Sequence, residues 1–126
     1  MSRMKKQKPE ELLIEWMNRL DLNDWEIHLE PCCSEEEMEL ADCDGCSIYM
    51  EMRKIARIQM INPELRKDPM YSFDYEEALV HELLHLKLCM LETSDDWNDL
   101  QMRILHQELN DIAKALVKAK RCRNGQ

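Results

Sequence analysis

Apolar residues recur at helical spacing near the start of the chain, at Leu12, Trp16 and Leu20. This period predicts an amphipathic helix over residues 9–20. Pro9 suits its first position, because the first turn of a helix does not use that backbone N–H.

Further along the chain, apolar and polar residues alternate with the period of a β-strand. The alternation predicts strands over residues 25–30, 46–52 and 55–61. The pair Asp44-Gly45 is typical of a tight hairpin turn and stands just before the second of them.

Helical spacing returns in the second half of the chain. Residues 64–73 are expected to form a loop, after which Asp74 and Glu77 fit a capping box that opens a helix running to about Leu91. A last helix is expected over residues 96–120. Its candidate N-caps are Thr93, Ser94 and Asp95. Its amphipathic pattern rests on a stripe that comprises Gln101, Leu105, Leu109, Ile112 and Leu116. A helix, then strands, then two helices predict an α+β fold with a small, mostly antiparallel or mixed sheet.

Length and charge narrow the class of protein. The chain has 126 residues, which fits a single domain over 1–126, with tails expected at 1–8 and 121–126. The longest apolar run is too short to span a membrane, and the basic N-terminus lacks a signal-peptide pattern, so we expect a cytoplasmic protein. The net charge of -9 repels phosphate backbones and disfavours a nucleic-acid partner.

Six cysteines raise the question of a second metal site. Cys43 and Cys46 form a CxxC pattern, and with Cys32 and Cys33 they could make a four-thiolate zinc site. Adjacent residues on extended backbone point opposite ways, however, so Cys32 and Cys33 make a poor half-site. The favoured interpretation is that these residues are small apolar fillers, with free thiols.

The strongest chemical signal is the pattern His-Glu-x-x-His at His81, Glu82 and His85. On a helix the two histidines lie about 40° apart around the axis and about 6 Å apart along it, so both imidazoles can bind one zinc ion. Glu82 is turned about 100° from His81, where a general base for a zinc-bound water would stand. The face opposite the histidines is apolar and comprises Leu79, Leu83, Leu86 and Met90.

A third ligand has to come from elsewhere in the chain. Glu92 shares the histidine face by angle, but on a continuous helix it lies about 10 Å beyond His85. His106 and Glu108 flank the apolar stripe of the last helix, and helical phase does not separate them. His28 alternates with apolar residues in its strand and is expected at the surface.

At these residues the sequence resembles the zincin metallopeptidases, and more closely their compact bacterial, phage and prophage members. The shared outline comprises Trp25, Ile27 and Leu29, then Ala56, Ile58 and Met60, then residues 79–86, and finally His106–Leu116. The chain lacks the glycine and the third histidine of the extended metzincin motif.

The resemblance implies a minimal zincin-like fold, with an N-terminal helix, a small sheet, an active-site helix and a C-terminal helix. It implies a Zn²⁺ ion held by His81, His85 and His106, and Glu82 as general base in the hydrolysis of a peptide or protein substrate. An edge strand beside the cleft would align that substrate. The candidates for an oxyanion donor are Tyr49, Tyr71 and Tyr75.

A different function remains open on the same residues. The domain could be a non-catalytic, zinc-stabilised protein-interaction module of zincin fold. Such a site would be closed by a fourth ligand, from Glu92, Glu108 or a cysteine, and removal of the metal would unfold the domain. The number of protein ligands therefore separates the two hypotheses.

Overall fold

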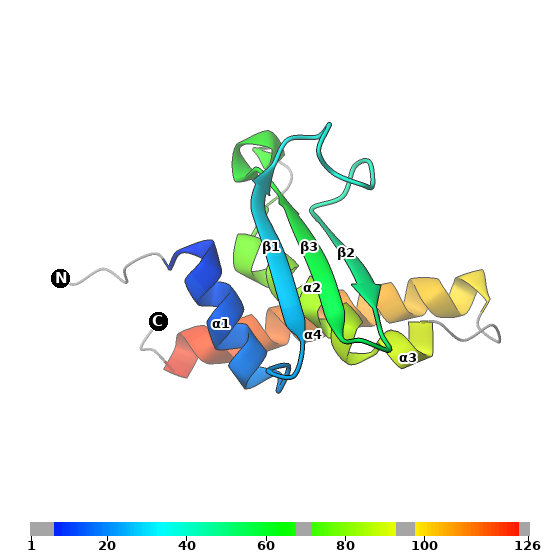
Figure 1. The fold of residues 1–126 in the computed structure, drawn as a ribbon. Helices are drawn as coiled ribbons and strands as arrows, with labels where there is room; N and C mark the ends of the chain where they lie inside the picture. The colour runs from blue at the N-terminus through cyan, green and yellow to red at the C-terminus, as the bar shows by residue number, and fades with distance from the viewer. Residues whose placement is uncertain (1–6, 68–71, 93–97, 124–126) are drawn as a thin grey trace.

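The computed structural model describes residues 7–67, 72–92 and 98–123, and it has an α+β architecture (Figure 1). In chain order the elements are α1 (Pro9–Arg19), β1 (Glu26–Cys33), β2 (Gly45–Met50), β3 (Ile55–Ile61), the 3-10 helix η1 (Pro63–Arg66), α2 (Tyr75–Lys87), α3 (Cys89–Glu92) and α4 (Asp99–Arg123). The order of a helix, strands and then helices agrees with the sequence prediction.

The three strands form one mixed sheet in the order β1-β3-β2. β1 pairs with β3 in parallel, and β2 pairs with β3 in antiparallel fashion. The prediction of a hairpin turn at Asp44-Gly45 is wrong. The hairpin joins β2 to β3 through residues 51–54, where Lys54 adopts a positive φ of 54°. Asp44 instead extends the sheet, because its carbonyl accepts a hydrogen bond of 2.9 Å from the Ile61 N–H.

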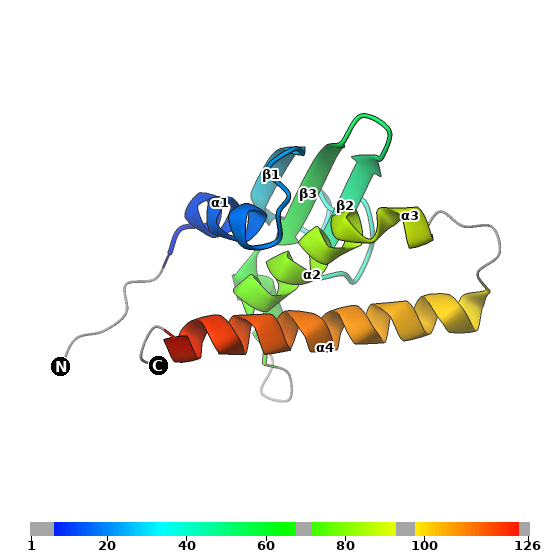
Figure 2. The ribbon, with the colours of Figure 1, turned by 90° about the horizontal axis from the view of Figure 1, so that it is seen from below.

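The helices lie on one face of this sheet. α1 and α2 pack against the strands, and α4 lies along the outer side of α2 (Figure 2). The fully buried side chains at the centre come from every layer and include Trp16, Ile58, Met60, Leu79, Leu83, Leu86, Leu109 and Val117. This core fixes α2 between the sheet and α4, so the motif helix is held from both sides.

The motif helix α2 begins as predicted and ends earlier. Asp74 is its N-cap, and the carboxylate accepts a hydrogen bond of 3.1 Å from the Glu77 N–H. The helix stops at Lys87, and the N–H of Leu88 bonds back to carbonyls of the last turn. The predicted continuation to Leu91 is therefore broken into the short helix α3. Met90, expected opposite the histidines, is 72% exposed because it follows this break.

The long helix α4 is capped by a residue that the sequence prediction missed. The Asn98 side chain accepts from the Gln101 N–H at 2.9 Å, and the Gln101 side chain accepts from the Asn98 N–H at 2.8 Å. This reciprocal pair satisfies two backbone donors at the start of the helix. The predicted N-caps Thr93, Ser94 and Asp95 lie outside the described residues.

The buried stripe of α4 differs in part from the predicted stripe. Leu105 and Leu109 are buried as predicted, but Ile112 is 41% exposed, and the small residue Ala113 faces α2 instead. The stripe continues at Val117 and follows a steady spacing of four residues. A small side chain at this contact lets the two helix backbones approach closely.

Parts of both segments expected as tails belong to helices or their caps. α4 continues through residues 121–123, and Arg121 forms an ion pair of 2.7 Å with Asp74. At the other end, the Lys8 N–H donates to the Glu11 carboxylate at 2.9 Å, so residue 8 belongs to the start of α1. Residues 1–6 and 124–126 lie outside the described residues.

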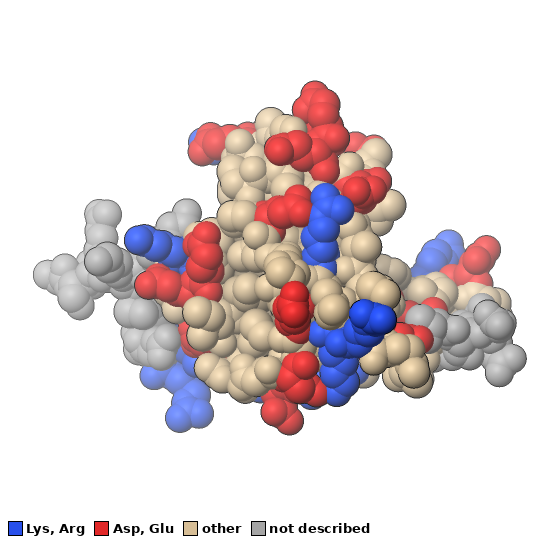
Figure 3. Space-filling view, in the orientation of Figure 1, with Lys and Arg blue, Asp and Glu red and all other residues tan. Residues whose placement is uncertain are grey.

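Acidic side chains gather at the end of the sheet where the segment between β1 and β2 lies (Figure 3). Its exposed acids are Glu35, Glu36, Glu37 and Glu39. Within the described ranges, none of the helices combines the length and the apolar character that crossing a bilayer requires.

Candidate metal centre

His81 and His85 face the same side of α2, one helical turn apart. Their Nε2 atoms are 3.0 Å apart, and their ring centroids are separated by 4.8 Å. Two nitrogens that bind one zinc ion tetrahedrally, at about 2.0–2.1 Å each, lie roughly 3.3 Å from each other. The observed separation is therefore close to that of two ligands of one ion.

His106 completes the cluster from α4, which runs beside α2 in the opposite direction (Figure 2). Its ring lies 4.7 Å from that of His85 and 5.8 Å from that of His81, measured between centroids. One nitrogen from each of the three residues lies within 4.8 Å of the others. The structure thus brings together the three histidines that were predicted as metal ligands.

The chemistry of this donor set fits a divalent transition metal. Neutral imidazoles suit zinc, copper, iron and nickel, and they are poor ligands for magnesium and calcium. The buried Nδ1 atom of His81 makes no hydrogen bond of normal geometry within the described chain. An unpartnered buried ring nitrogen is costly, and a metal ion bound by this ring would supply a strong interaction that offsets that cost.

Electrostatics keep two of the three rings neutral. Burial, together with the neighbouring His85 and His106, lowers the pKa of His81 to about 4. Burial and the nearby His85 likewise lower the pKa of His106. Because metal ions bind the neutral imidazole, these two residues need not lose a proton near pH 7 before they coordinate a metal ion.

His85 differs because a carboxylate contacts its ring. Glu92 was expected to lie too far from His85 if the helix were continuous, but the helix ends at Lys87. The break at Leu88 turns α3 back, so that the Glu92 oxygens lie 2.7 and 2.8 Å from His85 Nδ1. Burial alone would lower the pKa of His85, but this hydrogen bond and the charges of Glu82 and Glu92 raise it.

Glu82 lies beside the histidines, and a residue of the sheet holds its side chain in place. Its Oε1 atom is 2.6 Å from the hydroxyl of Ser47, which also lies 3.1 Å from the Glu82 carbonyl oxygen. Gly45 allows this arrangement, since a Cβ there would stand 2.9 Å from Glu82 Cγ. Burial raises the pKa of Glu82, and the Ser47 hydrogen bond opposes that rise.

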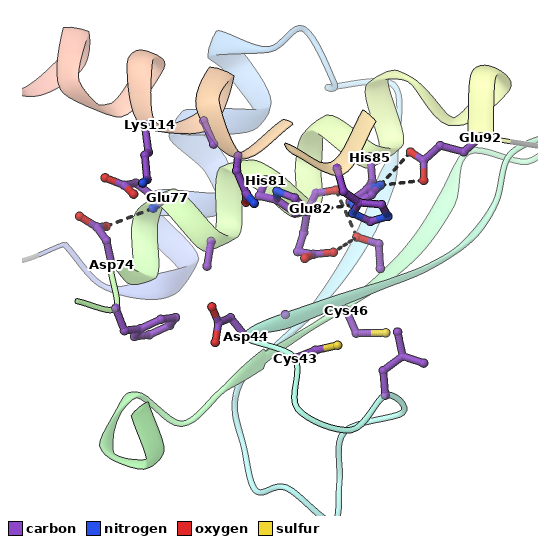
Figure 4. A pocket seen from close by; sticks show the side chains of 18 of the residues that line it. Cys43, Asp44, Cys46, Asp74, Glu77, His81, Glu82, His85, Glu92 and Lys114 are labelled. Carbon is purple, nitrogen blue, oxygen red and sulfur yellow. Dashed lines mark hydrogen bonds and ion pairs between the residues drawn. The ribbon is translucent and has the colours of Figure 1, made fainter. Parts of the chain in front are cut away.

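These groups line one pocket of about 620 Å³ between α2, α4 and β2 (Figure 4). Along its helical wall, His85 faces His106, His81 faces Asn110 and Glu77 faces Lys114, in the register of two antiparallel helices. β2 contributes the opposite wall through Gly45, Cys46, Ser47 and Tyr49. The pocket therefore combines a metal-binding group, a buried carboxylate and a strand edge.

The remaining candidate ligands do not join the cluster. Glu108 is exposed on α4, and His28 is exposed on β1 as predicted, with Glu26 at 2.5 Å from its Nε2. Cys32 is exposed while Cys33 is buried, as the alternation on a strand requires. Within the described ranges, the three histidines are the one group of ligand atoms close enough to hold a metal.

The three tyrosines have different places. The Tyr75 hydroxyl donates to the Pro31 carbonyl at 2.7 Å and is not part of the pocket wall, whereas Tyr49 lines the pocket. Burial and the charge of Glu92 raise the pKa of Tyr49 to about 12, so its phenol keeps its proton at neutral pH. Tyr71 lies outside the described residues.

Comparisons of the chain with models of protein families, with curated protein sequences and with solved structures returned no match. The resemblance to zincin metallopeptidases therefore stays a prediction that rests on the motif residues.

Proposed function

We propose that the protein is a zinc-dependent peptidase that works by a zincin-like mechanism. The observation that carries the proposal is that a group of three histidines and the buried carboxylate of Glu82 line the same pocket. His81 and Glu82 are adjacent on α2, so the carboxylate stands beside the ligand group without belonging to it.

Each residue has a role that follows from its surroundings. A zinc ion bound by imidazoles supplies a Lewis acid that acidifies water and polarises a carbonyl group. Glu82 acts as general base: it takes a proton from the attacking water and passes it to the leaving amine. Its raised pKa suits a group that must both accept and release a proton near neutral pH. Tyr49 is the best placed of the three tyrosines to donate a hydrogen bond to the developing oxyanion.

The proposal of a peptide substrate rests on the strand beside the pocket. β2 is an edge strand of the sheet, paired with β3. Gly45 and Tyr49 of this strand line the pocket with Glu82 opposite. An extended peptide that pairs with such an edge presents its main chain to the pocket, which is how strand addition recognises peptides.

The test compares Glu82→Gln with the wild type, using a fluorescently labelled unfolded casein in the presence of zinc. We expect the variant to retain zinc and to lose cleavage by about 10²–10⁴-fold, the usual contribution of a general base. Glu108→Gln, the same chemical change on the exposed face of α4, is the matched control and should cleave as the wild type does. Full cleavage by zinc-loaded Glu82→Gln would rule out the mechanism.

The alternative, a closed structural zinc site in an interaction module, requires a fourth protein ligand. The converging group in the described part of the chain has three members, and Glu92 is engaged by His85. X-ray absorption on the zinc-loaded protein counts the ligands directly. Three imidazoles plus solvent favour the peptidase, and a fourth protein ligand favours the module.

A further inference from the structure

The carboxylate of Glu92 covers the Nδ1 edge of the His85 ring (Figure 4). Both side chains are nearly buried, at 10% and 9% exposure. They come from different helices, and the contact exists only because α2 ends at Lys87 and α3 turns back. Burying a carboxylate costs free energy unless the charge is paired and hydrogen-bonded. Here both oxygens lie against the same ring nitrogen, so His85 is the partner that compensates the burial of Glu92.

We propose that Glu92 is a positioning residue of the metal centre, which fixes the tautomer and the orientation of His85 and thereby raises the affinity for a divalent metal ion. The inference rests on the proposed function, since it assumes that the histidine cluster holds the metal.

The hydrogen-bonding capacity of the two groups determines the tautomer. An ionised carboxylate accepts hydrogen bonds and donates none, so His85 Nδ1 must carry the proton. In the neutral ring the lone pair then lies on Nε2, the atom that is 3.0 Å from Nε2 of His81. Glu92 therefore directs the free electron pair of His85 toward the other histidines.

Charge adds to this effect. Three neutral imidazoles leave both positive charges of a divalent ion uncompensated in a partly buried site. The negative charge of Glu92 lies within 2.8 Å of His85 Nδ1, on the side of the ring away from the other histidines. A carboxylate in this place stabilises the bound cation through the ring, without coordinating it.

A direct ligand role for Glu92 does not fit the same geometry. Both of its oxygens lie within 2.8 Å of Nδ1, whereas the cluster is formed at the Nε2 side of His85. Glu92 is accordingly not a member of the converging ligand group.

The experiment measures zinc affinity by competition with a chromophoric chelator, using the full chain. We expect Glu92→Ala to bind zinc about 10- to 100-fold more weakly than the wild type. Glu92→Gln should show a smaller loss, because its amide oxygen still accepts from Nδ1 while the charge is gone. Glu108→Gln is the matched control and should bind as the wild type does.

A second readout separates positioning from a purely structural role. Nitrogen NMR of the zinc-loaded wild type should show His85 protonated at Nδ1 and bonded to zinc through Nε2. In Glu92→Ala the Nδ1–H group has no carboxylate partner, so its NMR signal should shift. Circular dichroism of the zinc-free variant should show that the fold is kept. If Glu92→Ala is unfolded without zinc, the comparison is made with Glu92→Gln.

The outcomes distinguish a failure of this inference from a failure of the proposed function on which it rests. A wild type that binds no zinc overturns the proposed metal centre itself. Wild-type affinity in both Glu92 variants, with tight binding by the wild type, overturns only the positioning role. Loss of an oxygen ligand from the zinc in Glu92→Ala, seen by X-ray absorption, overturns it as well, because Glu92 would then be a ligand.

Discussion

At the scale of single residues, Gly45 determines where Glu82 can lie. The nearest atoms to a Cβ built at this position would be Glu82 Cγ at 2.9 Å and Met60 Sδ at 3.1 Å. The glycine is required for space, because its backbone is not in the left-handed region. The Ser47 hydroxyl then donates a hydrogen bond to the Glu82 carboxylate, which occupies the space beside Gly45.

Gly45→Ala should therefore displace Glu82. We expect a loss of about 1–3 kcal/mol in the free energy of unfolding, the usual cost of inserting a methyl group into packed structure. Urea denaturation of the zinc-free protein measures it. Zinc affinity serves as the internal control and should be preserved, because the three atoms nearest to the added methyl group belong to Glu82 and Met60 and not to the histidines. Unchanged stability together with unchanged casein cleavage would contradict this assignment of Gly45.

At the scale of elements, periodicity predicted the helices and strands well, and it predicted interruptions poorly. α1, β3 and the start of α2 follow from apolar spacing and from the cap at Asp74. The end of α2 does not, since residues 88–92 keep a helical pattern although the helix ends at Lys87, and this break places Glu92 on His85. A calculation along a straight helix could not find that contact.

The residues of the candidate site also divide into those that the sequence could predict and those that it could not. The spacing of His81, Glu82 and His85 specifies their geometry once the segment is a helix. His106 could not be separated from Glu108 by phase, and the packing of Ala113 on α2 now shows which face of α4 turns inward. Ser47 carried no chemical motif, and only the strand pairing shows that it faces α2.

The N-cap of α2 gives a prediction for pH. Burial alone would raise the pKa of Asp74, but hydrogen bonds from Arg121 and from the Glu77 N–H lower it. A lowered pKa in the folded state stabilises the protein above the unfolded-state value of about 3.9, and this stabilisation is lost as the pH falls through the folded value.

Asp74→Asn keeps an acceptor for the cap and removes the charge. We expect the variant to be less stable than the wild type by about 0.5–1 kcal/mol at pH 7, because Arg121 is partly exposed and the ion pair is screened by solvent. The difference, followed by urea denaturation, should be the same at pH 7 and pH 5 and should shrink below about pH 4. Arg121→Gln should cost less in the Asp74→Asn background than in the wild type, and an equal cost in both backgrounds would show that Arg121 acts through Glu76 alone.

At the scale of the whole molecule, one buried polar network joins three helices. The Trp16 indole on α1 donates to the Glu76 carboxylate on α2 at 2.7 Å, and Lys120 on α4 pairs with the same oxygen. Lys120 also donates to Gln7 at 2.6 Å. Glu76 and Lys120 are 8% and 5% exposed, so neither charge is well solvated.

Lys120→Met should leave Glu76 buried without its main counter-charge. We expect a loss of about 3 kcal/mol in the free energy of unfolding, the lower part of the range for breaking a buried pair, because the Trp16 N–H and Arg121 remain. Urea denaturation should show that the double variant Lys120→Met/Glu76→Gln recovers most of that loss. Lys118→Met makes the same change at an exposed position of α4 and should be close to neutral. A Lys120→Met protein as stable as the wild type would mean that the network adds nothing.

The central place of β3 also governs the order in which the molecule can assemble. β2 and β3 are joined by a short turn, and a hairpin of this kind closes in about 1–10 μs. β1 is made earlier on the ribosome, yet its partner in the sheet is β3, about thirty residues further along the chain. Closing that long parallel contact is the slower event. Until then the apolar side of β1 has only α1 to cover it, so the nascent chain is most prone to aggregate before β3 leaves the ribosome.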